Sequence, residues 1–310
     1  MVMKLETITF QDQEKYEIFV YKWLPESGIP VKAAVQIAHG MAETAARYER
    51  FAKALTESGY MVYANDHRGH GRTAKEPEKV GFMGTDGLNR AVEDMHQLHQ
   101  IIQRENPSLP NFLIGHSMGS FLAQQYISLY GAGLQGVILS GVSGKQGFIL
   151  NIGAILAKLI MALKGSQTPS PFLDQLTFGS YNQHCKPNRT KFDWLSRDPA
   201  EVDAYIADPF CGAVFSAGYF YDLCRFLKQI HRLANQRRIP VTLPIYLFCG
   251  TNDPVGNYSK TVRQLIETYQ SLGIQDVTCK FYPEGRHEML NEINRDEVTR
   301  DIITWLDGHL

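Results

Sequence analysis

The sequence lacks features that would assign it to several other classes of protein. Its 31 basic and 32 acidic side chains leave a formal net charge of -1, whereas binding to nucleic acid requires a clustered basic surplus. No nucleic-acid partner is therefore expected. No C-x-x-C pair occurs among its five cysteines, which are Cys185, Cys211, Cys224, Cys249 and Cys279. Their spacing encodes neither a zinc knuckle nor a thioredoxin-type redox pair.

Long apolar runs are also missing. No run reaches about 18 residues, the length needed to span a bilayer, and residues 1–10 lack the core of a signal peptide. An odd number of irregularly spaced cysteines is typical of buried, reduced thiols in an intracellular protein. The sequence therefore predicts a soluble, cytoplasmic protein. Its 310 residues, 44% of them hydrophobic, can bury a core that needs neither disulfides nor a metal to fold.

Short apolar runs alternate with longer helical patterns along most of the chain. The runs that we interpret as strands cover residues 15–23, 33–39, 60–65, 111–114, 134–139, 245–249 and 277–282. The helical patterns cover residues 48–58, 88–105, 119–130, 259–272 and 295–310. Such alternation predicts an α/β fold with a mostly parallel central sheet flanked by helices on both faces.

The alternation breaks between residues 145 and 240. We predict that residues 145–240 form a helical cap (lid), inserted into a core made of residues 1–144 and 241–310. The first stretch of the cap, 148–163, carries Lys158 as its only charged residue, so it lacks the polar face of a typical surface helix. Two interpretations are open. The stretch is either a buried helix packed on the core or a lid helix that makes transient contact with a membrane surface and admits an acyl chain.

The pentapeptide Gly115-His116-Ser117-Met118-Gly119 lies between a predicted strand and a predicted helix. This is the context that the G-x-S-x-G nucleophile elbow requires. A serine on so sharp a turn holds strained backbone angles, and glycines two positions away avoid collision with neighbouring backbone. The turn would lift the Ser117 hydroxyl above the sheet and leave the Met118 N–H at a helix N-terminus, where it can stabilise an oxyanion. Ser117 is therefore the predicted nucleophile.

A serine hydroxyl needs a base to accept its proton and an acid to orient that base. In the chain order of the α/β hydrolases, both follow the serine. His287 is the predicted base, because it lies in the loop before the last predicted helix, whereas His184 and His231 fall in the cap. Asp253 is the predicted acid, because it follows the strand at 245–249. The alternative for Asp253 is a turn-forming aspartate before a proline.

Two acidic residues and one histidine-rich loop are weaker candidates. Glu284 and Glu288 lie so close to His287 in the chain that their side chains are poorly placed to orient it. Residues 66–71 read Asp-His-Arg-Gly-His-Gly. We interpret this cluster as a structural loop, in which the aspartate and the arginine make fixed hydrogen bonds, rather than as a metal site.

A second oxyanion donor is expected from the loop after the strand at 33–39. Gly40 allows close approach of the backbone, and Met41 would place its N–H beside that of Met118. The alternative for this stretch is a simple turn at the end of a strand.

Several segments together resemble the monoacylglycerol lipase and lysophospholipase branch of the α/β hydrolases, often labelled serine aminopeptidase-like. They are His39-Gly40-Met41, the loop at 66–71, the elbow at 115–119, Asn252-Asp253-Pro254-Val255, His287-Glu288, and the cap stretches 195–199 and 207–210. The resemblance implies that Ser117, Asp253 and His287 form a catalytic triad. It also implies that Met41 and Met118 supply the N–H groups of the oxyanion hole.

The implied activity is that of a serine carboxylic-ester hydrolase acting on a single-chain lipid ester. The favoured substrate is a monoacylglycerol, cleaved to fatty acid and glycerol through an acyl-enzyme on Ser117, with no metal or organic cofactor. A lysophospholipase or a general carboxylesterase would use the same residues. A serine aminopeptidase would need an acid in the cap to hold an amino terminus, and Glu201, Asp203 and Asp208 are candidates. The remaining alternative is a ligand-binding pseudo-hydrolase without activity.

Overall fold

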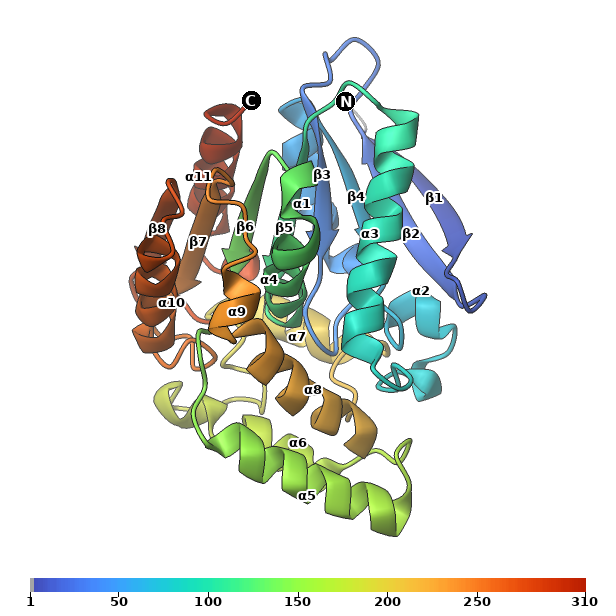
Figure 1. Cartoon of the computed structure of the whole chain (residues 1–310), viewed down its shortest axis with the longest axis vertical. Helices are drawn as coiled ribbons and strands as arrows, with labels where there is room; N and C mark the ends of the chain where they lie inside the picture. Colours follow the sequence, from blue (N-terminus) through green and yellow to red (C-terminus); the bar gives the residue numbers. More distant parts are fainter. Residues whose placement is uncertain (1–2) are drawn as a thin grey trace.

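The computed structural model describes residues 3–310, and within them an eight-stranded sheet forms the centre of the protein (Figure 1). Its order is β1-β2-β4-β3-β5-β6-β7-β8. β2 is antiparallel to both of its neighbours, and every other neighbouring pair is parallel. The predicted mostly parallel sheet is thereby confirmed. The strands are β1 (Lys4–Gln11), β2 (Glu17–Leu24), β3 (Ala33–Ala38), β4 (Tyr60–Asn65), β5 (Asn111–His116), β6 (Gly136–Ser140), β7 (Ile245–Gly250) and β8 (Val277–Tyr282).

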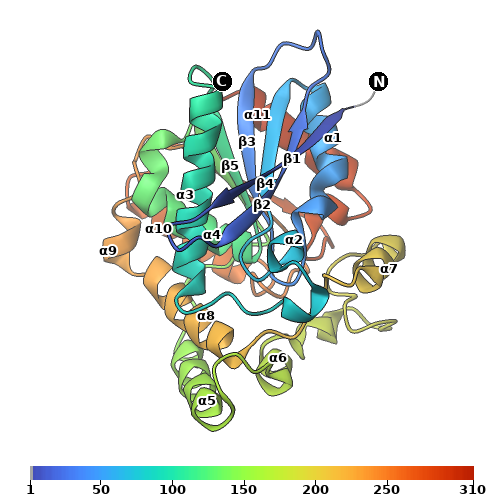
Figure 2. The same cartoon turned by 90° about the vertical axis from the view of Figure 1, so that its right-hand side faces the viewer.

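Helices cover both faces of the sheet (Figure 2). Apolar residues of α3, α4 and α10 join one core cluster, and those of α1 and α11 join another. Every residue of β3, β5, β6 and β7 is buried, which explains why these strands are continuous apolar runs in the sequence. The core helices are α1 (Glu49–Glu57), α2 (Gly71–Ala74), α3 (Gly87–Glu105), α4 (Met118–Tyr130), α10 (Lys260–Ser271) and α11 (Arg295–Asp307).

One strand was not predicted from the sequence. β1 lies at the edge of the sheet, and Phe10 is its only buried residue. A strand so exposed carries little of the apolar signal that marks the inner strands. The strands predicted at 15–23 and 134–139 do form, as β2 and β6, with bounds shifted by one or two residues.

Residues 145–240, which we continue to call the cap, contain five α-helices and no strand. These helices lie beyond the carboxyl ends of the parallel strands (Figure 1). They connect β6 to β7, so the sheet continues on either side of the insertion. The cap helices are α5 (Ile149–Lys164), α6 (Pro171–Phe178), α7 (Pro199–Ala207), α8 (Ala217–Ile230) and α9 (Leu233–Gln236).

The apolar stretch at the start of the cap forms α5, which packs against α8. Only Leu150 and Ala157 of its 16 residues are buried, so the interpretation as a buried core helix is wrong. Apolar side chains elsewhere along α5 face solvent, and Leu163 is 82% exposed. Together with Phe148, the residue before α5, five of them form what we call the apolar cap surface: Phe148, Ile149, Ile152, Ile155, Leu159 and Leu163. None of the helices within residues 3–310 is long and apolar enough to cross a membrane.

Candidate active site

Ser117 is the single residue between the end of β5 and the start of α4. Its backbone has φ 52° and ψ -119°, a region in which an L residue is strained. The Ser117 N–H donates a hydrogen bond to the carbonyl oxygen of Ser140 at 2.9 Å, which holds the turn against β6. Strained residues held by their surroundings cluster at functional sites, so the backbone geometry has the form of a nucleophile elbow.

Two glycines leave the space that this turn needs. A Cβ atom on Gly119 would collide with the carbonyl oxygen of Ala38, and one on Gly115 would collide with the carbonyl oxygen of Gly119. Both obstacles are backbone atoms, which cannot rotate aside as the end of a side chain can. The structure thus confirms the prediction that a residue larger than glycine at position 115 or 119 would collide with neighbouring backbone.

Asp253 and His287 form a buried pair. Both carboxylate oxygens of Asp253 lie 3.0 Å from Nδ1 of His287, and the Val255 N–H donates to Oδ1 of Asp253 at 2.9 Å. Burial by itself would lower the pKa of His287, but the carboxylate of Asp253, helped by Glu288 and Glu43, outweighs burial and raises that pKa above 6.5. A carboxylate at Nδ1 keeps the proton of the neutral ring there and leaves Nε2 able to accept another.

Ser117 and His287 line the same cavity, whose volume is about 350 Å³. His116, the last residue of β5, also contributes to its wall, and its ring lies 4.8 Å from that of His287. The cap closes the other side of the cavity with aromatic and polar side chains, among them Phe178, Phe192, Trp194, Tyr205, Asp174 and Asn182. A ligand in this cavity would therefore contact the candidate nucleophile, the candidate base and the cap together.

The loop after β3 has a fixed peptide orientation. Nδ1 of His39 lies 2.7 Å from the Gly40 carbonyl oxygen, and Nε2 of His39 accepts the His67 N–H at 3.0 Å. The proton of His39 therefore sits on Nδ1 and is donated to Gly40. Because the C=O and N–H of one planar peptide point in opposite directions, this bond also fixes the direction of the Met41 N–H. Among residues 3–310, neither the Met41 N–H nor the Met118 N–H has a hydrogen-bond acceptor.

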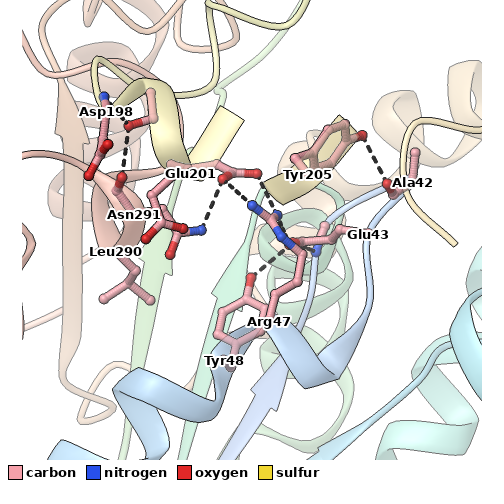
Figure 3. A network of polar contacts seen from close by, with 12 residues as sticks. Ala42, Glu43, Arg47, Tyr48, Asp198, Glu201, Tyr205, Leu290 and Asn291 are labelled. Carbon is pink, nitrogen blue, oxygen red and sulfur yellow. Dashed lines mark hydrogen bonds and ion pairs between the residues drawn. The ribbon is translucent and has the colours of Figure 1, made fainter. Parts of the chain in front are cut away.

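A buried ion-pair network that the sequence did not reveal lies behind this loop (Figure 3). Arg47 donates to Glu43 at 2.6 Å and to both carboxylate oxygens of Glu288 at 2.7 Å. The other oxygen of Glu43 accepts the Gly40 N–H at 2.5 Å and the Tyr48 hydroxyl at 3.0 Å. Arg47 thus links the loop after β3 to the loop of the candidate base. The only signal in the sequence is the spacing of Glu43 and Arg47, four residues apart after a strand.

The weaker candidates have other contacts. Glu288 pairs with Arg47, so it is not free to orient His287. Glu284 is 81% exposed in its side chain, and its nearest cation is Arg197 at 3.7 Å. Asp253 is therefore the acid that contacts the imidazole.

The loop at 66–71 is structural, as predicted. Arg68 donates to Asp94 at 2.8 Å, and Asp66 accepts the N–H groups of Ala45 and Arg72 at 2.8 and 2.7 Å. No group of three or more histidine, cysteine, aspartate or glutamate side chains in the described part of the chain is arranged to hold a metal ion.

The three cap acids considered for an aminopeptidase are engaged elsewhere. Glu201 pairs with Arg295 at 2.7 Å, and Asp203 pairs with Arg189 at 2.6 Å. The carboxylate of Asp208 accepts an N–H within its own turn at 2.9 Å. None of the three lines the cavity.

All five cysteines are free thiols, but they are less buried than predicted. Cys185 and Cys249 are buried, whereas Cys211, Cys224 and Cys279 are partly exposed. None of the five lines the cavity that holds Ser117.

The fold and the comparisons with known proteins together define a serine ester hydrolase of the α/β-hydrolase class. Residues 29–294 match the family described as "Serine aminopeptidase, S33", and the chain belongs to this family, in its monoacylglycerol lipase branch.

Relatives with known names and structures support this assignment. The chain is 29% identical to a monoacylglycerol lipase from Mycolicibacterium smegmatis, covering 93% of this chain and 92% of that protein. It is 28% identical to the monoglyceride lipase of Rattus norvegicus, covering 94% and 88%. Among solved structures, a thermostable carboxyl esterase from Bacillus coagulans in complex with glycerol is 31% identical, with a TM-score of 0.90 and 99% of both chains covered.

Proposed function

We propose that the protein hydrolyses a monoacylglycerol to a fatty acid and glycerol through an acyl-enzyme on Ser117. The observation that carries the proposal is the arrangement of Ser117, strained on its turn, in one cavity with the buried His287–Asp253 pair. The division into a core, residues 1–144 and 241–310, and a cap, residues 145–240, is part of the same proposal.

The arrangement suits a two-step ester hydrolysis. Ser117 attacks the ester carbonyl carbon while Nε2 of His287 takes the hydroxyl proton, and Asp253 stabilises the imidazolium that forms. The N–H groups of Met41 and Met118 donate to the oxyanion of the tetrahedral intermediate. His287 then protonates the departing glycerol oxygen. A water molecule, activated by the same histidine, attacks the acyl-enzyme and releases the fatty acid.

The size of the cavity and the names of the relatives favour this substrate. A volume of about 350 Å³ is near the lower end of the range for ligand cavities, which favours an ester with one acyl chain over one with three. Two of the relatives are named monoacylglycerol or monoglyceride lipases, and the Bacillus coagulans esterase was solved with glycerol. A lysophospholipase and a general carboxylesterase are the alternatives within the same chemistry.

The apolar cap surface supports a second part of the proposal, transient contact of the cap with a membrane surface. Its six side chains lie on α5 and on the residue that precedes it, and Phe148 and Leu163 are 73% and 82% exposed. Large exposed apolar patches mark sites of contact with membranes or other proteins. A substrate that is itself dispersed in lipid would reach the cavity from such a surface. The cytoplasmic location stays a prediction from the cysteine pattern.

One carboxylate in the cavity favours a second candidate function, that of an aminopeptidase. Asp174 of α6 lines the cavity, and its carboxylate has no hydrogen-bond or ion-pair partner among residues 3–310. Burial raises its pKa, and Lys191 offsets this in part. Such a carboxylate could accept a hydrogen bond from an ammonium group or from a glycerol hydroxyl. Asp174→Asn should therefore weaken binding of whichever head group the enzyme takes.

The test is a substrate panel on the wild type and Ser117→Ala. The panel contains monoacylglycerols of several chain lengths, lysophospholipids, p-nitrophenyl esters and aminoacyl amides. The proposal expects Ser117-dependent hydrolysis that is fastest on a monoacylglycerol, and labelling of Ser117 by a fluorophosphonate. Faster cleavage of aminoacyl amides would favour the aminopeptidase. Wild-type protein that neither hydrolyses the panel nor reacts with the probe would identify a ligand-binding pseudo-hydrolase.

A further inference from the structure

The loop that carries His287 is hydrogen-bonded to four consecutive residues of the cap. The carbonyl oxygens of residues 193–196 all accept hydrogen bonds from residues 286–288. The Trp194 carbonyl accepts the His287 N–H at 3.3 Å, and the Leu195 carbonyl accepts the Glu288 N–H at 2.7 Å. The guanidinium of Arg286 donates to the carbonyl oxygens of Asp193 and Ser196, at 2.6 and 2.9 Å. The backbone around the candidate base is therefore held by the cap as well as by β8.

A buried carboxylate fixes this contact between cap and core. Glu292 is fully buried. One of its oxygens accepts the N–H groups of Arg286 and Arg197, at 2.9 and 3.2 Å. The other oxygen accepts a hydrogen bond from Nε of Arg197 at 2.9 Å. Because a buried carboxylate is stable only with its partners in place, this geometry holds Arg197 of the cap at a fixed distance from the residue before His287.

An aromatic side chain of the same cap segment lies against the catalytic imidazole. The ring centroids of Trp194 and His287 are 5.0 Å apart, at an interplanar angle of 39°. Trp194 also stacks with Phe178 of α6, at 6.2 Å and 10°. Trp194 is buried, so it limits both the tilt of the imidazole and the access of water to that face of the ring.

Further contacts anchor the adjacent helix α7 to the core, and Figure 3 shows the one between Tyr205 and Ala42. Asp198 and Glu201 both accept hydrogen bonds from Arg295, at 3.0 and 2.7 Å, and the Tyr205 hydroxyl donates to the Ala42 carbonyl at 2.9 Å. The part of the cap next to His287 is thus fixed both to the loop that carries His287 and to the loop after β3.

We propose that the cap segment 193–197 positions the catalytic base: Trp194 sets the orientation of the imidazole, and the contact between Arg197 and Glu292 sets the position of its loop. This inference rests on the proposed ester hydrolysis. A general base must lie within hydrogen-bond reach of the proton that it takes, and a misplacement of about 1 Å can cost about 100-fold in rate. The cap therefore acts in the chemical step as well as in the choice of substrate.

The experiment uses p-nitrophenyl acetate, a small soluble ester whose entry does not depend on a fitted acyl site. Trp194→Ala and Glu292→Gln should each lower kcat by about 10- to 100-fold with little change in KM. Trp194→Phe, which keeps an aromatic ring against the imidazole, should restore most of kcat. Arg189→Gln is the control, because it breaks an exposed cap ion pair with Asp203 and should leave kcat unchanged.

Circular dichroism and thermal unfolding separate catalysis from folding. Glu292 does not line the cavity, so Glu292→Gln decides the question if Trp194→Ala does not fold. Unchanged kcat in folded Glu292→Gln, or an effect of Trp194→Ala on KM alone, would overturn the positioning role while leaving the proposed function intact. Absence of Ser117-dependent hydrolysis in the wild type would instead overturn the proposed function.

Discussion

Arg47 binds Glu288 through two hydrogen bonds of 2.7 Å, although the two lie 241 positions apart in the chain. The Arg47 and Glu288 side chains are 11% and 6% exposed, and the same guanidinium also binds Glu43. Buried ion pairs of this kind add little net stability when complete, but the loss of one partner leaves an unpaired buried charge. This makes Arg47 the most sensitive single position of the network.

Replacement of Arg47 by methionine should destabilise the protein by about 3 to 5 kcal/mol, because two carboxylates would stay buried without their cation. Urea unfolding at pH 7 measures this difference. Lys53→Met is the matched control on α1. It breaks an exposed ion pair with Glu57, so we expect a change of less than about 1 kcal/mol. Equal effects of the two substitutions would contradict a structural role for Arg47.

The cost of losing Arg47 should depend on pH. Burial would raise the pKa of Glu288, but Arg47 outweighs burial and lowers that pKa from 4.5 to about 2. A lowered pKa in the folded state stabilises the protein fully above the unfolded value, and this contribution is lost as the pH falls toward the folded value. In Arg47→Met, burial without the cation raises the pKa of Glu288 above 4.5, so the difference in stability between the wild type and the variant should begin to shrink above pH 4.5 and keep shrinking toward about pH 2. A difference that stays constant over this window would exclude the ion pair as its source.

The pair of Asp253 and His287 leads to a prediction for the pH profile of kcat/KM. In the proposed mechanism His287 must be neutral to accept the proton of Ser117, and its pKa is raised above 6.5 mainly by Asp253. Activity should therefore rise with pH through a limb that lies above 6.5 in the wild type. Asp253→Asn removes the raising charge, so the limb should move to lower pH, while kcat falls by about 10⁴-fold. A limb that does not move would mean that another group controls the profile.

Local sequence was sufficient for the parts of the site that depend on a single turn. The elbow at Ser117 follows from a pentapeptide between a strand and a helix, and Asp253 and His287 follow from their places after β7 and β8. In a parallel sheet the carboxyl ends of the strands meet at one edge, so these three residues were expected near one another. The structure brings Asp253 and His287 into contact, and Ser117 to the same cavity.

Contacts between distant segments could not be predicted in the same way. Nothing near Arg47 in the chain indicates Glu288, and nothing near Trp194 indicates that its carbonyl accepts the His287 N–H. These pairs depend on how the cap and two loops fold over the sheet. The helix α5 shows a related limit, because an apolar run has the same composition whether its side chains are buried or exposed.

Because packing at the elbow is close, we expect a single methyl group added at Gly119 to lower both stability and the reactivity of Ser117. A Cβ on Gly119 would collide with backbone at Ala38, whereas one on Gly147 would have no atom within 4 Å. Gly119→Ala should therefore cost about 3 kcal/mol or more and also disturb Ser117, while Gly147→Ala should leave stability and activity unchanged. Thermal unfolding and the rate of fluorophosphonate labelling measure the two effects. A stable, fully reactive Gly119→Ala would show that the turn can relax.

The apolar cap surface can be tested apart from the chemistry, because α5 lies outside the cavity lining. Ile155 and Leu159 are 61% and 56% exposed, so replacing both by aspartate should leave the fold intact. Cleavage of p-nitrophenyl acetate should not change, whereas turnover of a long-chain monoacylglycerol in zwitterionic vesicles should fall, since the cap can no longer enter the interface. Both substitutions together change the net charge by two, and Lys158→Glu provides the same change without removing apolar surface. If the double variant loses activity equally on both substrates, or if Lys158→Glu has the same effect, the surface does not contact the membrane through its apolar side chains.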